Sequence, residues 1–308
     1  MGVHVYTPSR AEFITTEGLR SYMGELNAAL LACGLERTSD SGQMDVGAVT
    51  ALPNTVSGYF NHIYPPLLYK WPGIGGYPDI YIRIVLTVGN AYDRNTCHVP
   101  MMQVSVGRGT NGAGQLTGAD VLIAAPNNAL LQDNCTYIYP GWDGVISFAD
   151  DFLCVCIDPG QHSSNNNHRW GLPFFCIERQ ENGDFHSTCI TLNSDIRYTP
   201  APTATAIIKV ASSIDGVVKT IDHPCAFIDA PALIGGEVVV QKVYRYDRVQ
   251  DISEFSPLVA VPASLPLWAS LDFEHGGEIR TYVGCGSDVG NRITSVVANT
   301  WVPAMRTS

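Results

Sequence analysis

The chain has 308 residues, 45% of them hydrophobic, which is enough for one large domain or two ordinary ones with a sizeable core. Its formal net charge of −11 argues against nucleic-acid binding, which needs a basic surface to neutralise phosphates. No signal-like start and no apolar run of membrane-spanning length is found, so neither secretion by a leader nor a membrane span is expected.

The strongest helix signal lies near the N-terminus. Thr15 and Thr16 are N-cap candidates, and Gly34 is placed to end the helix. Apolar residues recur between them at helical spacing: Leu19, Met23, Leu26, Leu30 and Cys33. Strict alternation from Ile80 to Val88 predicts a strand, and we expect the helix to pack on its sheet.

The rest of the first 120 residues predicts a mixture of turns and strands. Ser39–Gly42 is typical of a turn, and Pro65-Pro66 with Trp71-Pro72-Gly73 predicts a rigid loop. Gly58–Tyr64 and Met101–Val106 predict further strands. The glycine-rich stretch Gly107–Gly118 is expected to end this first unit.

Strand signals recur in the second half of the chain, with hairpin dipeptides at Asn182-Gly183 and Asp215-Gly216. The predicted strands are Val145–Phe148, Phe152–Ile157, Phe174–Arg179, His186–Leu192, Ala206–Val210, Val217–Thr220, Val238–Tyr246 and Ile279–Val283. We therefore predict an α+β fold that is predominantly antiparallel β. A helix-plus-sheet lobe over residues 1–120 would be followed by a β-sandwich-like lobe over 121–308, the two forming either separate lobes or one continuous compact unit.

Gly107–Gly112 matches the G-x-G-x-x-G spacing of dinucleotide-binding loops. The following residues, Ala113–Gly118, are too rich in glycine to open a helix whose N-terminus could hold a pyrophosphate. We expect a tight surface loop here and no cofactor.

The nine cysteines are an odd number without repeated spacing, which excludes a complete intramolecular disulfide framework. Cys154 and Cys156, followed by His162 and His168, could be imagined as a zinc site. Because this C-x-C lies inside an apolar run, we expect buried thiols and no metal.

Two further patterns could carry chemistry or binding. Asp150 and Asp151, with Asp143 and Asp158 nearby, could pair as acid and base for glycoside cleavage, but adjacent aspartates on extended backbone point to opposite faces, so a solvated turn is expected. Without a G-x-S-x-G elbow, no serine stands out as a nucleophile, and we assign no catalytic residue. A cluster of aromatic side chains could stack on sugars, although aromatic residues more often pack in cores and interfaces. The cluster consists of Tyr64, Tyr69, Trp71, Tyr77 and Tyr81.

Several segments resemble a group of tailed-bacteriophage virion structural proteins. They are residues 28–43 around the end of the predicted helix, Ser57–Tyr59, Tyr81–Ile84 and Val104–Gly118, in that order. The last is the most specific, because it fits a loop of the form G-x-G-T-[DN]-G-x-G-x-[LI]-[ST]-G. Phe175–Asp184, which contains Glu178-Arg179, also resembles a hairpin of that group.

The resemblance covers roughly the first 120 residues well and the rest patchily. The sequence departs from the group at Gly89–Tyr92, where a Tyr-Gly-Ser type of turn is more common, and in its number of cysteines. The resemblance implies a role in the virion and brings no catalytic residue.

We therefore expect a non-enzymatic structural subunit of a phage tail, baseplate or neck. It would be assembled in the host cytoplasm as a homo-oligomer with other virion proteins, and release into oxidising surroundings could cross-link some cysteines. The candidate interface loops are represented by Gly107, Arg108, Gly109, Thr110, Asn111 and Gly112, and by Gln161, His162, Asn166 and His168. The alternatives are a glycan-binding tail adhesin that uses Tyr69–Tyr81, and, with least support, a tail hydrolase.

Overall fold

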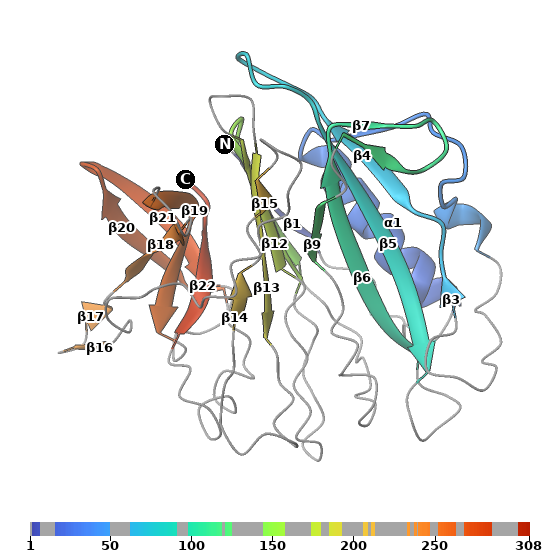
Figure 1. The fold of residues 1–308 in the computed structure, drawn as a ribbon. Helices are drawn as coiled ribbons and strands as arrows, with labels where there is room; N and C mark the ends of the chain where they lie inside the picture. Colours follow the sequence, from blue (N-terminus) through green and yellow to red (C-terminus); the bar gives the residue numbers. More distant parts are fainter. Residues whose placement is uncertain are drawn as a thin grey trace.

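The computed structural model describes residues 2–6, 16–49, 62–90, 98–118, 121–124, 144–157, 174–179, 185–192, 206–208, 211–212, 233–234, 237–238, 240–246, 252–262, 268–284 and 301–308. Three larger β-sheets and one α-helix make up most of these residues (Figure 1). Each strand pairing in the described ranges is antiparallel, so the predicted α+β fold with predominantly antiparallel strands is confirmed.

The first sheet contains the two long strands predicted from alternation. Its strand order is β2 (Glu36–Arg37), β4 (Leu67–Trp71), β5 (Ile80–Asn90), β6 (His98–Gly107) and β9 (Val121–Ala124), with β3 (His62–Ile63) also paired to β5. The predicted loop between Pro65 and Gly73 is wrong in its middle, because β4 occupies it. Pairing with β5 supplies the partners that local sequence could not reveal.

The predicted N-terminal helix is confirmed as α1 (Thr16–Ala32). It ends in a Schellman arrangement, in which Leu35 N donates to Leu30 O and Gly34 N to Leu31 O. Gly34 has a φ of 86°, a conformation that glycine adopts without a Cβ penalty. This geometry closes the helix and returns the chain toward β2.

The predicted packing of α1 on the first sheet is also confirmed. The predicted helix stripe from Met23 to Cys33 is buried together with Ile80, Ile82 and Ile84 of β5. The same core cluster includes residues of the second sheet, among them Leu153 and Phe175. One hydrophobic core therefore connects the helix to both sheets.

The second sheet confirms the strands predicted from Val145 to Leu192 and most of the one predicted from Ala206, whereas residues 2–6 and 211–212 were not predicted as strands. Its order is β1 (Gly2–Tyr6), β10 (Gly144–Phe148), β11 (Phe152–Ile157), β12 (Phe174–Arg179), β13 (Phe185–Leu192) and β14 (Ala206–Ile208), with β15 (Ala211–Ser212) also paired to β13. The hairpin of β12 and β13 is present, although its predicted turn at Asn182-Gly183 lies outside the described residues.

The third sheet was only partly predicted. Its order is β18 (Gln241–Tyr246), β19 (Ile252–Pro262), β22 (Trp301–Arg306), β21 (Glu278–Gly284) and β20 (Ser270–His275). The strand predicted over Val238–Tyr246 is divided, since β17 (Glu237–Val238) pairs with β16 (Leu233–Ile234) and β18 pairs with β19. Asp215-Gly216 and Val217–Thr220 lie outside the described residues.

Pairing across the chain joins segments from both predicted lobes. The first residues form β1 at the edge of the second sheet, whereas β9, beyond residue 120, joins the first sheet through β6. The helices in the described part of the chain are too short or too polar to cross a membrane.

Candidate functional site

The glycine-rich loop after β6 is a small hairpin. Its strands are β7 (Gly109–Thr110) and β8 (Leu116–Thr117), and the Asn111 side chain holds the turn by accepting from the amides of Ala113 and Gln115. Gly114 has a φ of 84°, which makes this position favourable only for glycine. The predicted tight loop is thus confirmed for the segment.

This hairpin is bonded to the turn that precedes Gln43. The amide of Ser41 donates to Gly112 O at 2.9 Å, and the Thr110 hydroxyl donates to the Asp40 carboxylate at 2.9 Å. On the other side, Arg83 Nε of β5 donates to Gly114 O at 3.3 Å. The loop is therefore tied both to the turn and to the first sheet.

Asp40 is held in its charged form by these contacts. Partial burial by itself would raise the pKa of this carboxyl, but hydrogen bonds from Thr38 and Thr110 and from the amides of Gly114 and Gly112 bring the pKa below its usual value of 3.8. A carboxylate that accepts several hydrogen bonds fixes the turn more firmly than a neutral acid would.

The Gln43 side chain links the same turn to the first sheet. Its Oε1 accepts from the amide of Leu68 at 2.9 Å and from the Arg37 guanidinium at 2.7 Å. Its Nε2 donates to the carbonyls of Thr38 at 2.8 Å and Asp40 at 3.1 Å. One amide thus satisfies polar groups from three segments.

Arg37 extends this network to the helix. Its guanidinium donates to Asn27 Oδ1 at 3.2 Å and lies over the Tyr69 ring at 5.3 Å. The Tyr69 hydroxyl donates to the same Asn27 oxygen at 2.8 Å. Burial raises the pKa of Tyr69 to about 12 against the opposing effect of Arg37, so the hydroxyl stays protonated and can donate.

Arg179, at the end of β12, connects the first and second sheets. We call a polar side chain that bonds one sheet to another a joint. The Arg179 side chain is 3% exposed, lies 3.9 Å over the Trp71 ring and donates from Nη2 to the carbonyls of Trp71 at 3.1 Å and Pro72 at 2.6 Å. Burial lowers the pKa of Arg179, and the charge of Asp79 opposes that effect. The guanidinium holds the base of the β4–β5 turn against the second sheet.

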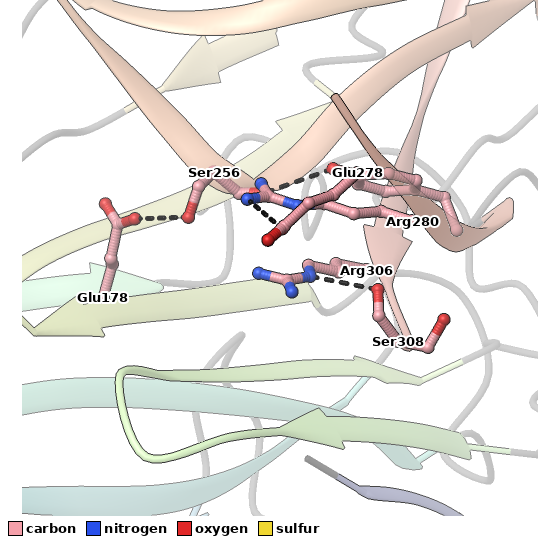
Figure 2. A network of polar contacts seen from close by, with 7 residues as sticks. Glu178, Ser256, Glu278, Arg280, Arg306 and Ser308 are labelled. Carbon is pink, nitrogen blue, oxygen red and sulfur yellow. Dashed lines mark hydrogen bonds and ion pairs between the residues drawn. The ribbon is translucent and has the colours of Figure 1, made fainter. Parts of the chain in front are cut away.

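The side chain of the neighbouring residue, Glu178, points to the opposite face of the second sheet, because side chains alternate along a strand. Its carboxylate accepts from the Ser256 hydroxyl of β19 at 2.8 Å (Figure 2). A further contact between these two sheets runs from the Ser147 hydroxyl to the carbonyl of Arg306, whose guanidinium lies 5.9 Å over the Phe152 ring. Adjacent residues of β12 therefore contact the first and third sheets.

The predicted interface residues fall into two groups. Residues 107–112 are described, and Asn111 and Gly112 are exposed at the tip of the hairpin. Gln161, His162, Asn166 and His168 lie outside the described residues, as do Asp143 and Asp158. In the turn between β10 and β11, Asp150 is exposed as predicted for a solvated turn, whereas Asp151 is half-buried.

Core packing is confirmed for three of the five clustered aromatic residues, since Tyr64, Tyr69 and Trp71 are buried. Tyr77 and Tyr81 are half-buried, and Arg179 lies 6.0 Å over the Tyr77 ring. One arginine guanidinium lies over the Trp71 ring and another over the Tyr69 ring, and both rings are buried.

Sequence reasoning missed the roles of Gln43 and Arg179, although both lie in segments that carry the resemblance. A signal was present for Arg179, because the strand Phe174–Arg179 places two charged residues directly after four apolar ones. Such residues in a buried strand need partners on neighbouring elements. The partners themselves are distant in sequence and could not be read from it.

Two of the cysteines in the described residues are bonded to each other. Cys154 of β11 and Cys176 of β12 form a disulfide, whereas Cys33 and Cys156 are buried outside it. Burial therefore holds as predicted for these four, but the expectation of thiols is wrong for Cys154 and Cys176. In the described part of the chain, no three His, Cys, Asp or Glu side chains gather as metal ligands would.

No protein-family model matches the chain, and no curated protein matches it significantly.

Proposed function

We propose that the chain is a non-enzymatic structural subunit of a bacteriophage virion, part of its tail, baseplate or neck, that acts through contacts between proteins. One observation carries the proposal: the described residues of the segments that resemble virion proteins bond to one another or to neighbouring sheets. The turn at Asp40–Gln43 bonds to the Gly107–Gly118 hairpin, and Glu178 and Arg179 contact separate sheets. The shared residues thus position a scaffold and its loops.

The proposal includes a β-sandwich-like lobe made by the second and third sheets. The contacts from Glu178 to Ser256 and from Ser147 to Arg306 support it. Such a scaffold would present short, fixed loops to neighbouring subunits, since loops held by a rigid framework lose little conformational entropy on binding. The exposed tip of the Gly107–Gly118 hairpin is the described loop best suited to this role.

Cryo-electron microscopy of the phage that encodes the chain tests the location. Repeated copies in a ring or collar of the tail, baseplate or neck are expected. Absence from purified particles would overturn the proposal. Density only at exposed fibre tips would replace it with the glycan-binding adhesin.

A charge substitution tests the contact surface directly. Ala113→Arg adds a long cation at the exposed hairpin tip and leaves the backbone amide of Ala113 free to bond to Asn111. Ala28→Arg makes the same change on the exposed face of α1 and serves as the control. We expect Ala113→Arg to lower incorporation into particles about tenfold, a loss of about 1.4 kcal/mol in contact energy, and Ala28→Arg to leave it unchanged. Equal incorporation of the two variants would exclude the hairpin as the interface.

A further inference from the structure

The second sheet contains a pair of cysteines placed opposite each other by its register. Cys154 of β11 pairs with Cys176 of β12, their Cα atoms are 4.1 Å apart, and both side chains are fully buried. The short Cα separation is that of a closely spaced antiparallel pair, in which the side chains are adjacent. The strand pairing itself therefore brings the two sulfur atoms together, and no backbone movement is needed for them to bond.

We propose that Cys154 and Cys176 form a redox-controlled lock of the second sheet: a dithiol while the chain is in a reducing cytosol, and a disulfide after it meets an oxidising medium. The timing rests on the proposed function, because a virion subunit passes from the host cytosol to the outside. The pairing rests only on the geometry of β11 and β12.

The oxidant is a small-molecule disulfide of the glutathione type. Because both side chains are fully buried, the exchange requires local opening of the sheet. The thiolate of one cysteine then attacks the oxidant and releases one small thiol, which leaves a mixed disulfide on the protein. The second cysteine, as its thiolate, attacks the protein sulfur of the mixed disulfide and displaces the other small thiol. Two protein S–H bonds and one small-molecule S–S bond are thereby exchanged for one protein S–S bond and two small thiols.

Register explains why this pair is selected. Cys156, two residues along β11, lies opposite Phe174 of β12. Cys33 follows α1 and lies on neither β11 nor β12, and burial raises the pKa of its thiol to about 12. Both residues are therefore suitable controls.

The lock lies at a structurally important position. Cys154 also pairs with Ser147 of β10, whose hydroxyl bonds to Arg306, and Cys176 is two residues before Glu178 on β12. A covalent link here fixes the two strands that carry contacts to the first and third sheets. Oxidation should thus stabilise the joints described above.

The first experiment uses the full chain, purified with reductant and then oxidised with glutathione disulfide. Peptide mapping after alkylation should find Cys154 linked to Cys176, while Cys33 and Cys156 remain alkylatable after unfolding. In parallel, dithiothreitol should lower the Tm of the oxidised wild-type protein by about 5–10 °C. Alkylation of both Cys154 and Cys176 after oxidation would overturn the pairing.

Two variants make the thermal result specific. Cys156→Ser should keep the shift with dithiothreitol, whereas Cys154→Ser should lose it. An unchanged shift in Cys154→Ser would overturn the assignment. Peptide mapping of the wild-type protein decides the pairing even if Cys154→Ser fails to fold.

Acid-quenched extracts of infected cells and purified particles test the timing. Thiols are expected in the cytosolic chain and the disulfide in the particle. A complete bond in the cytosol, or free thiols in the particle, would overturn redox control. Absence of the chain from particles would instead overturn the proposed function and leave the pairing intact.

Discussion

Replacing Arg179 with Met tests whether this guanidinium joins the first and second sheets. Methionine keeps most of the volume but removes two hydrogen bonds from a charged donor to Trp71 O and Pro72 O, each worth about 1.5–3 kcal/mol. It also removes the contact with the Trp71 ring, worth about 2 kcal/mol in a desolvated site. Relief of the cost of burying the charge offsets part of this loss, so we expect a net decrease of about 3 kcal/mol in the free energy of unfolding.

Urea denaturation followed by tryptophan fluorescence measures the change, since Trp71 lies under the substituted side chain. Arg83→Met is the matched control: Arg83 is half-buried and makes one described hydrogen bond, to Gly114 O at 3.3 Å. We expect this control to lose less than about 1 kcal/mol. A loss for Arg179→Met no larger than that of the control would refute the assignment of Arg179 as a joint.

Three further substitutions test the loops, and a fourth, on α1, is a control. Gly73→Ala would place a Cβ 2.1 Å from the carbonyl oxygen of Tyr77, so we expect the free energy of unfolding, measured by urea denaturation, to fall by about 1–3 kcal/mol. In the control Gly24→Ala, on α1, the added Cβ meets no atom within 4 Å, so this change should be neutral or stabilising. Gln43→Ala removes the hydrogen-bond partner of the Leu68 amide and of the Thr38 carbonyl. We expect a lower Tm, corresponding to a decrease of about 1–3 kcal/mol in the free energy of unfolding. Folding lowers the pKa of Asp40, so the ionised carboxylate contributes stability above about pH 4 that is lost as the pH falls through the folded pKa. The difference in stability between the wild-type protein and Asp40→Asn should therefore shrink as the pH falls. A constant difference from pH 6 to pH 2 would contradict this prediction.

Local patterns predicted the elements whose signals are periodic. The stripe of α1, the alternation of β5 and the apolar run of β11 each repeat with the spacing of the structure they form. The strands β19 and β22 were missed. β19 contains Pro257 and Pro262, and β22 contains Pro303, which reduces their apparent strand propensity. Their stability comes from pairing with each other across a long stretch of chain.

The candidate site was predictable only in part. A tight loop at Gly107–Gly118 follows from its glycines, three of which have positive φ, and from Asn111, because an asparagine side chain can accept hydrogen bonds from the amides of its own turn. The attachment of this loop to Asp40 and Ser41 could not be predicted from the sequence. The hydrogen bonds span about seventy residues, and any polar turn could have contacted the loop.

By itself, the sequence determined the helix, the two long strands of the first sheet, most strands of the second sheet and the tightness of the glycine-rich loop. These are local properties, governed by the period of hydrophobic residues and by the backbone freedom of glycine. Only the tertiary structure decided which polar side chains became joints and which cysteines became partners. Arg179 over Trp71 and Cys154 beside Cys176 are products of strand register, which is fixed when distant segments bury a shared core.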